Sequence, residues 1–129
     1  MAHAFVDGGD PSESERPLSI GGSDRVDASH FDSFHYAALG HLHGPQYKGR
    51  STTRYSGSLG KFSFSEVNHN KGVCLVDLDA DGAARMTHLA FKPERDLCTV
   101  EGYIDELLSA PDPDLVNCLL YTSPSPRDA

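Results

Sequence analysis

The sequence has no tryptophan, little positive charge and no long apolar stretch, and these shortages exclude several classes of protein. Lys and Arg total 11 against 19 Asp and Glu in 129 residues, so the net charge is −8 with neutral histidines. This balance argues against a polybasic nucleic-acid clamp and against a binder of anionic membranes. It leaves a nuclease open, because bound divalent ions can supply the positive charge that phosphates need. The apolar runs are only a few residues long, so no membrane-spanning helix is expected.

Cysteine is also scarce, and its three positions do not suit a disulfide framework. Cys74, Cys98 and Cys118 include no CxxC pair and make an odd number. That number favours a reducing compartment, so we expect a cytoplasmic protein. The hydrophobic fraction of 38% allows a modest core. A chain of this length has room for one domain at most, or for a piece of one.

The hydrophobic pattern predicts a strand-rich chain with one short helix. Apolar and β-branched runs indicate strands, Gly-containing turns indicate hairpins, and apolar residues spaced i, i+4 indicate a helix. The segment 25–31 fits either a brief strand or a single helical turn. The expected elements are a buried strand at 36–39, a hairpin of 46–48 with 52–55, a longer hairpin of 73–78 with 84–91 around a turn at 79–82, a strand at 97–100 and a helix at 102–109.

Seven histidines are the unusual count in this sequence. Two of them, His41 and His43, follow directly after the predicted strand and Gly40. In an extended segment such i, i+2 side chains point to the same side, about 6.5 Å apart. The ions of a binuclear site lie about 3.5–4 Å apart, so each imidazole could bind a different ion. The alternative is a pair of packed or exposed histidines, since a metal site needs more than two ligands.

His3 is a second candidate ligand, because it also sits in a short apolar segment. Its alternative is a surface histidine near a terminus. The other histidines have no partner at a useful spacing and are expected at the surface or at edges. They are His30, His35, His69 and His88.

The segment Arg54, Tyr55, Ser56, Gly57, Ser58 allows two interpretations. One is an ordinary strand end followed by a turn. The other is a border of a phosphate path, in which the Arg54 guanidinium and amide groups near Gly57 contact a substrate phosphate. The loop 12–16 is expected to be solvated, with a role near the site or in a subunit contact as its alternative.

Six stretches occur in one order along almost the whole chain: AHAFVDGG, SESERPLSIGG, YAALGHLHGPQ, RYSGSLGKFSFSE, KGVCLVDLDADG and RDLCTVEGYIDELL. GHLH after a short apolar strand resembles the last metal motif of the calcineurin-like metallophosphoesterases. Because RYSGS and KFSFSE follow GHLH, the chain resembles more narrowly the SbcD-type DNA exonuclease subunits of that superfamily. The resemblance implies an α/β fold, namely the C-terminal half of a metallophosphoesterase β-sandwich with flanking helices.

The resemblance also implies a site. His3 and His41 match ligands of the second metal ion, and His43 matches a ligand of the first. The two divalent ions are expected to be Mn²⁺, with Mg²⁺ as the alternative. Ligands from upstream motifs complete the pair in the family, and the histidine that protonates the leaving oxygen belongs to one of those motifs. We therefore expect no catalytic residue within this chain.

The implied organisation has three parts. Residues 1–110 are expected to form the C-terminal half of the phosphoesterase domain, and 111–117 the start of a linker to a capping domain. Residues 118–129 resemble a translated sequencing adapter and are expected to have no stable place in the fold. The chain is thus expected to be an internal fragment of a longer protein.

The implied function is hydrolysis of phosphodiester bonds at DNA ends, by exonuclease and endonuclease action that depends on two metal ions. The implied partners are DNA ends, an SbcC-type ATPase subunit and a second copy of the full-length subunit, with no membrane. The fragment alone is expected to be inactive, because three neutral imidazoles cannot offset two divalent cations. Two alternatives remain: an inactive gene fragment with an incomplete metal site, and another metallophosphoesterase, either a phosphatase or a phosphodiesterase. RYSGS and KFSFSE favour the nuclease.

Overall fold

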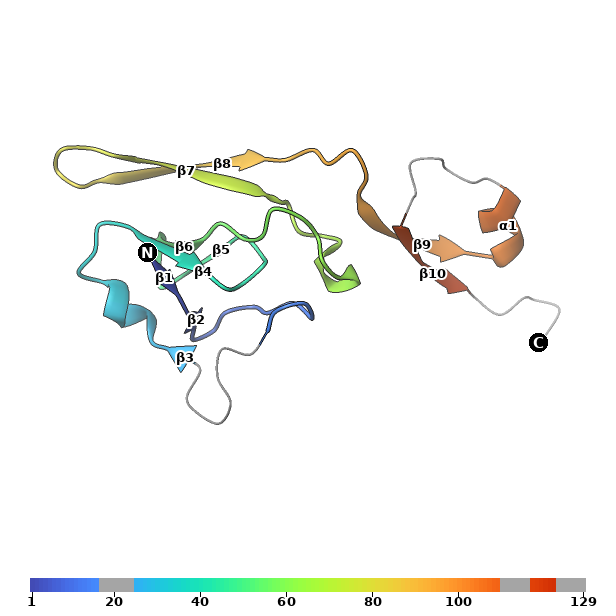
Figure 1. Cartoon of the computed structure of the whole chain (residues 1–129), viewed down its shortest axis with the longest axis horizontal. Helices are drawn as coiled ribbons and strands as arrows, with labels where there is room; N and C mark the ends of the chain where they lie inside the picture. The colour runs from blue at the N-terminus through green and yellow to red at the C-terminus, as the bar shows by residue number, and fades with distance from the viewer. Residues whose placement is uncertain (17–24, 110–116, 123–129) are drawn as a thin grey trace. The chain divides into compact units, whose positions relative to one another are not determined.

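The computed structural model describes residues 1–16, 25–109 and 117–122, and it divides the chain into two compact units, Met1–Phe91 and Lys92–Ala129 (Figure 1). The described residues are mostly strands with few helices, which confirms the strand-rich α/β class. They form one four-stranded sheet and three two-stranded sheets. The metallophosphoesterase sandwich stays a prediction. No helix in the described ranges is long and apolar enough to cross a bilayer.

The largest sheet has the order β1-β4-β6-β5. Its strands are β1 (Ala2–His3), β4 (Ala37–Gly40), β5 (Gln46–Lys48) and β6 (Arg50–Tyr55). β4 runs parallel to both β1 and β6, while β5 and β6 form the predicted hairpin. The register places His3 opposite Gly40, which is the last residue of β4. Three segments distant in sequence thus meet beside the loop that carries His41 and His43.

The core of the first unit lies on one side of this sheet. Alternate residues of β4 are buried, as the two-residue period of a strand requires. The core cluster contains Val6, Leu39, Leu42 and Tyr55. The Tyr55 hydroxyl donates to the Ala4 carbonyl at 2.6 Å and accepts from the Val6 N–H at 2.9 Å. This buried pair of hydrogen bonds ties the N-terminal segment to β6.

Short elements complete the first unit. β2 (Phe5–Val6) pairs in parallel with β3 (Arg25–Val26), and a 3₁₀ turn follows at Ala28–Phe31. The segment 25–31 therefore contains both of the elements that the sequence allowed. A second 3₁₀ turn, Phe64–Glu66, was not predicted.

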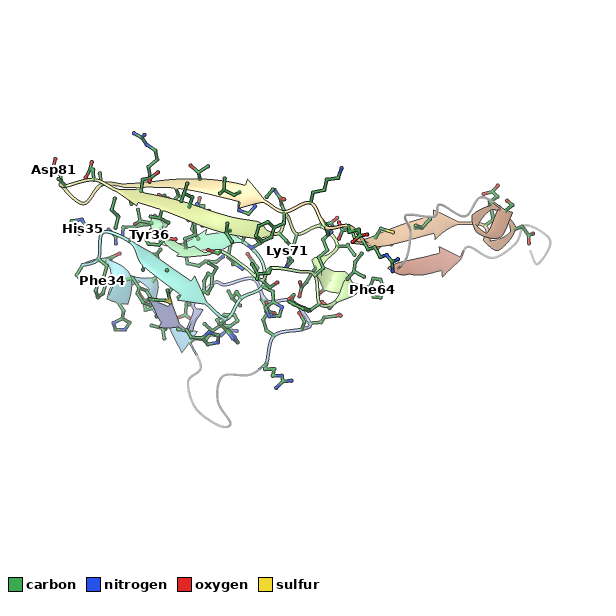
Figure 2. All side chains as sticks on the ribbon, turned by 45° about the horizontal axis from the view of Figure 1, so that its top comes forward. Phe34, His35, Tyr36, Phe64, Lys71 and Asp81 are labelled. Carbon is green, nitrogen blue, oxygen red and sulfur yellow. The ribbon has the colours of Figure 1, made fainter. Side chains whose placement is uncertain are left out.

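The strands β7 (Gly72–Leu78) and β8 (Ala84–Ala90) form the longer hairpin that the sequence predicts. The Asp79 carboxylate accepts from the N–H groups of Asp81 and Ala83, and Gly82 takes a φ of 84°. The ring of His35 lies where a side chain on Gly82 would be, near the tip of the hairpin (Figure 2). Gly82 is thus needed both for its backbone conformation and for its lack of a side chain.

The second unit contains β9 (Leu97–Gly102), α1 (Ile104–Ser109) and β10 (Asn117–Thr122). The predicted strand and helix are confirmed. β10 pairs in parallel with β9, from Asn117 opposite Leu97 to Thr122 opposite Gly102.

The assignment of residues 118–129 as an adapter-like tail stays a prediction, although Asn117–Thr122 forms a strand that the sequence does not predict. The physical reason lies in composition, because the stretch from Cys118 to Thr122 is rich in residues that favour strands, and the edge of β9 offers free backbone hydrogen-bonding groups. Residues 123–129, and most of the expected linker at 111–117, lie outside the described residues. The boundary between the two units, after residue 91, falls inside the predicted domain 1–110, and that domain assignment stays a prediction.

Candidate functional site

The loop after β4 turns sharply at its first histidine. His41 has a φ of 112°, and it is the single non-glycine residue with a positive φ in the described part of the chain. Such a conformation costs on the order of 1–3 kcal/mol and is retained only where its surroundings impose it. Because the backbone bends here, the expected extended geometry of His41–His43 is wrong. Leu42 points into the core between the two histidines, with 2% of its surface exposed.

His3 and His41 lie together at the end of β4. Their ring centroids are 5.4 Å apart, with an angle of 69° between the ring planes. The register of β1 against β4 explains this, since His3 lies opposite Gly40. Burial lowers the pKa of His41, and the nearby His3 and His43 act in the same direction while Glu15 opposes them. A neutral imidazole keeps the nitrogen lone pair that binds a metal ion.

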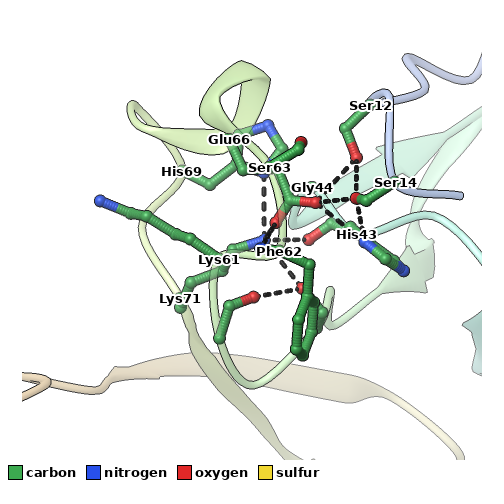
Figure 3. A network of polar contacts seen from close by, with 12 residues as sticks. Ser12, Ser14, His43, Gly44, Lys61, Phe62, Ser63, Glu66, His69 and Lys71 are labelled. Carbon is green, nitrogen blue, oxygen red and sulfur yellow. Dashed lines mark hydrogen bonds and ion pairs between the residues drawn. The ribbon is translucent and has the colours of Figure 1, made fainter. Parts of the chain in front are cut away.

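His43 is held at three of its polar atoms (Figure 3). Its ring Nδ1 lies 2.9 Å from Glu66 Oε1 and 2.8 Å from Ser14 Oγ. Its backbone N–H donates to Glu15 Oε1 at 2.6 Å. Its carbonyl accepts from Lys71 Nζ at 2.9 Å. The residue is therefore fixed in both backbone position and ring orientation.

The centre of this network is a buried ion pair. Glu66 is fully buried and Lys71 is 6% exposed, with 2.7 Å between Glu66 Oε2 and Lys71 Nζ. Burial alone would raise the pKa of Glu66, but the hydrogen bonds from Lys71, Ser14, His43 and the Phe62 N–H outweigh it and hold that pKa below its ordinary value. Glu66 is thus a carboxylate at neutral pH.

Two residues of the segment 54–58, Gly57 and Ser58, support His43. Gly57 has a φ of 85°, and a Cβ there would lie 2.7 Å from the His43 carbonyl oxygen. The Ser58 N–H donates to that same oxygen at 3.1 Å, and the Ser58 hydroxyl accepts from Lys71 Nζ at 2.8 Å. Tyr55 is fully buried in the core, so its side chain is not available to a substrate. The expected role of Tyr55, Gly57 and Ser58 beside a phosphate path stays a prediction.

Arg54 and Ser56 border two different hollows. Arg54 lines one of about 370 Å³ beside the metal-motif loop, and Ser56 lines another of about 420 Å³ together with His3. Most of the side chains that line the first hollow can form hydrogen bonds. Its lining residues are Asp10, Gly44, Pro45, Gln46, Arg54, Asn68, His69, Asn70 and His88.

His69 and His88, which the sequence left without partners, therefore meet Arg54 around one hollow. The His69 ring also lies 3.2 Å from the position of a Cβ on Gly44, so a side chain at Gly44 would displace it. Strand pairing across β7 and β8 brings His88 to this place, and sequence spacing does not show such a contact.

The donor set fits a transition ion in chemistry but not in number. Imidazole nitrogen suits Mn, Fe, Co, Ni and Zn. Within residues 1–16, 25–109 and 117–122, no group of three or more His, Cys, Asp or Glu side chains is placed to hold an ion. The structure brings His3 and His41 together and holds His43 by a separate network. In these ranges the metal site is partial.

The sequence does not single out Glu66 or Lys71 as functional. The string KFSFSE contributes to the family resemblance, and KGV begins a predicted strand. Neither pattern says that a glutamate in a 3₁₀ turn and a lysine before β7 meet around His43. The one available signal is that RYSGS, KFSFSE and GHLH occur together, which is consistent with a shared structural role.

Comparison with known proteins identifies the class. The chain is similar to a curated nuclease subunit, although no family model matches it. That relative is the SbcD subunit of the nuclease SbcCD from Staphylococcus epidermidis, with 40% identity over 108 residues. The match covers 84% of this chain and 29% of that relative. The predicted resemblance to SbcD-type subunits is thereby confirmed, and the chain spans less than a third of the relative's length.

Proposed function

We propose that this chain is part of a metal-dependent DNA nuclease of the SbcD type, which hydrolyses phosphodiester bonds at DNA ends. The observation that carries the proposal is the GHLH loop, where His41 is strained and paired with His3 and where His43 is fixed at three polar atoms. Imidazoles whose positions are fixed by several contacts are typical of metal ligands and not of surface histidines. The similarity to the SbcD subunit of Staphylococcus epidermidis supports the same class.

In this proposal His3 and His41 bind one divalent ion, and His43 binds the other. Mn²⁺ is the expected ion and Mg²⁺ the alternative. The ions would polarise the scissile phosphate and activate a water molecule. Because the chain spans 29% of the relative, the carboxylates and other ligands that complete the site are placed in parts of the protein that it does not cover.

Substrate binding is proposed at the hollow lined by Arg54. A guanidinium, two imidazoles and three side-chain amides around about 370 Å³ can donate to phosphate oxygens. The hollow adjoins Gly44 and Pro45, directly after His43, so a phosphate there would lie next to the metal-motif loop. The proposed partners are DNA ends, an SbcC-type ATPase subunit and a second copy of the full-length subunit, in the cytoplasm.

The test is a chimera in which this chain replaces the matching segment of the Staphylococcus epidermidis protein. With added Mn²⁺ the chimera should degrade linear DNA, whereas the 129-residue chain alone should not. His41→Ala or His43→Ala should remove nearly all turnover, because each removes a metal ligand. His30→Ala in the exposed 3₁₀ turn is the matched control and should keep full activity. Full activity of the His43→Ala chimera would contradict the ligand assignment.

A second assay tests the hollow. Arg54→Ala and His88→Ala chimeras should show a raised KM for DNA with a smaller change in kcat. The reason is that the native Arg54 and His88 side chains would contact the DNA strand away from the reacting phosphate. Cleavage of a small phosphodiester substrate with no cleavage of DNA would favour the alternative of another metallophosphoesterase. Absence of both activities would favour an inactive gene fragment.

A further inference from the structure

One ring nitrogen of His43 is engaged and the other is open. Both ring contacts, to Glu66 and to Ser14, are made by Nδ1. In the described part of the chain no hydrogen bond reaches Nε2, and Figure 3 shows that nitrogen turned away from the network. The Phe62 ring packs edge-on against the imidazole at 5.6 Å between centroids, and 23% of the His43 side chain is exposed.

The composition of this cluster suggests a Ser-His-acid triad, but its geometry excludes one. A nucleophile and an orienting carboxylate must contact opposite nitrogens of the histidine. Here Ser14 and Glu66 both contact Nδ1, and the Ser14 hydroxyl itself contacts Glu66 Oε1. The three side chains are therefore not arranged as a catalytic triad.

The contacts of Glu66 determine where the proton lies. The carboxylate is fully buried and paired with the Lys71 ammonium at 2.7 Å, and both partners are nearly inaccessible to water. An ionised carboxylate can only accept hydrogen bonds. The hydrogen between Glu66 Oε1 and His43 must then belong to Nδ1. A neutral imidazole with its proton on Nδ1 has its lone pair on Nε2.

We propose that Glu66 is a positioning residue that holds a proton on Nδ1 of His43 and so leaves Nε2 as the ring nitrogen presented to a divalent transition ion. Lys71 supports this role, because it balances the buried charge and also holds the His43 carbonyl. A carboxylate behind a ligating imidazole fixes the ring and increases its basicity. The tautomer follows from this structure alone, whereas the identity of the bound ion rests on the proposed function.

Long-range ¹⁵N–¹H correlation spectra of the labelled 129-residue chain, recorded without metal in mildly alkaline buffer, test the tautomer directly. The wild-type His43 ring should show a protonated Nδ1 and an unprotonated Nε2. In the variant Glu66→Leu/Lys71→Met, which removes both buried charges, the ring should change to the Nε2–H form. Ser14→Ala is the matched control and should keep Nδ1–H. Two results would overturn the proposal: an Nε2–H ring in the wild type, or a change of tautomer in Ser14→Ala. Neither result depends on a variant of Glu66.

A second readout addresses the ion. In the chimera, Glu66→Leu/Lys71→Met should weaken Mn²⁺ binding about 10–100-fold, while Ser14→Ala changes it little. If the chimera binds Mn²⁺ and the double variant binds it equally well, the positioning role is wrong. If the tautomer is as proposed but the chimera neither binds Mn²⁺ nor cleaves DNA, the proposed function fails and the ring assignment stands.

Discussion

Replacing Lys71 by methionine should destabilise the first unit more than any surface substitution. Methionine keeps an unbranched apolar chain but removes the ammonium that lies 2.7 Å from the fully buried Glu66 carboxylate. Removing one partner of a buried pair costs about 3–5 kcal/mol, because the other charge is left uncompensated. That figure includes the lost hydrogen bonds to the His43 carbonyl and the Ser58 hydroxyl. We therefore expect a loss of about 4 kcal/mol.

Urea unfolding followed by circular dichroism measures this loss. With a slope of about 2 kcal/mol per molar urea, about 4 kcal/mol lowers the midpoint by about 2 M. Lys48→Met is the matched control, because Lys48 pairs at 3.3 Å with Asp10, whose side chain is 89% exposed. The Lys48 side chain is 19% exposed, but its partner carboxylate lies in solvent, and such a pair contributes about 0–1 kcal/mol, so this control should stay near the wild type. A Lys71→Met midpoint equal to that of the control would refute the buried ion pair.

The same variant should change how stability depends on pH. The pKa of Glu66 in the folded chain lies below its ordinary value of 4.5, so the unfolded chain binds the proton more readily. The stabilisation is therefore present above about pH 4.5 and is lost as the pH falls further. In Lys71→Met the largest hydrogen-bond contribution that lowers the pKa of Glu66 is gone while burial still raises that pKa, so stability should rise less across this window. Parallel pH profiles of the two proteins would contradict this reasoning.

Two further substitutions test the supports of the site. Tyr55→Phe should cost about 1–3 kcal/mol in urea unfolding, because it leaves a buried N–H and a carbonyl of the N-terminal segment unpaired. Tyr47→Phe, with the ring 54% exposed, should cost less than about 0.5 kcal/mol. Gly57→Ala should destabilise by at least about 1 kcal/mol, since it adds a Cβ at a φ of 85° and 2.7 Å from a carbonyl oxygen; an unchanged midpoint would show that this turn can relax.

The strands and hairpins were predictable because their signals are local. The apolar run at 36–39 before Gly40 predicts β4, and β-branched residues before a turn at Gly82 predict the hairpin of β7 and β8. The helix Ile104–Ser109 follows from apolar residues at i, i+4 spacing. β10 was missed because resemblance to an adapter says nothing about backbone pairing, and any stretch with strand propensity can pair with an open edge.

The candidate site was predictable only as a list of histidines. The spacing of His41 and His43 suggested a shared face in an extended segment, but the backbone turns at His41, and a positive φ at a non-glycine residue has no sequence signal. The partners of His43 are equally hidden, because Glu66 and Lys71 reach it through the tertiary fold. A resemblance indicates which motifs occur together, whereas the structure shows that they meet at one residue.

The network around His43 also has a kinetic consequence. Its contacts to Ser14, Glu15, Glu66 and Lys71 span sequence separations of 29, 28, 23 and 28 residues. Contacts of this kind require large loops to close before they contribute any free energy, so they form slowly and late. His43 can reach its final position only after the segments on both sides of it have docked. In refolding experiments, the ring signals of this histidine should therefore report the completion of the first unit, well after the local hairpin of β7 and β8 has formed.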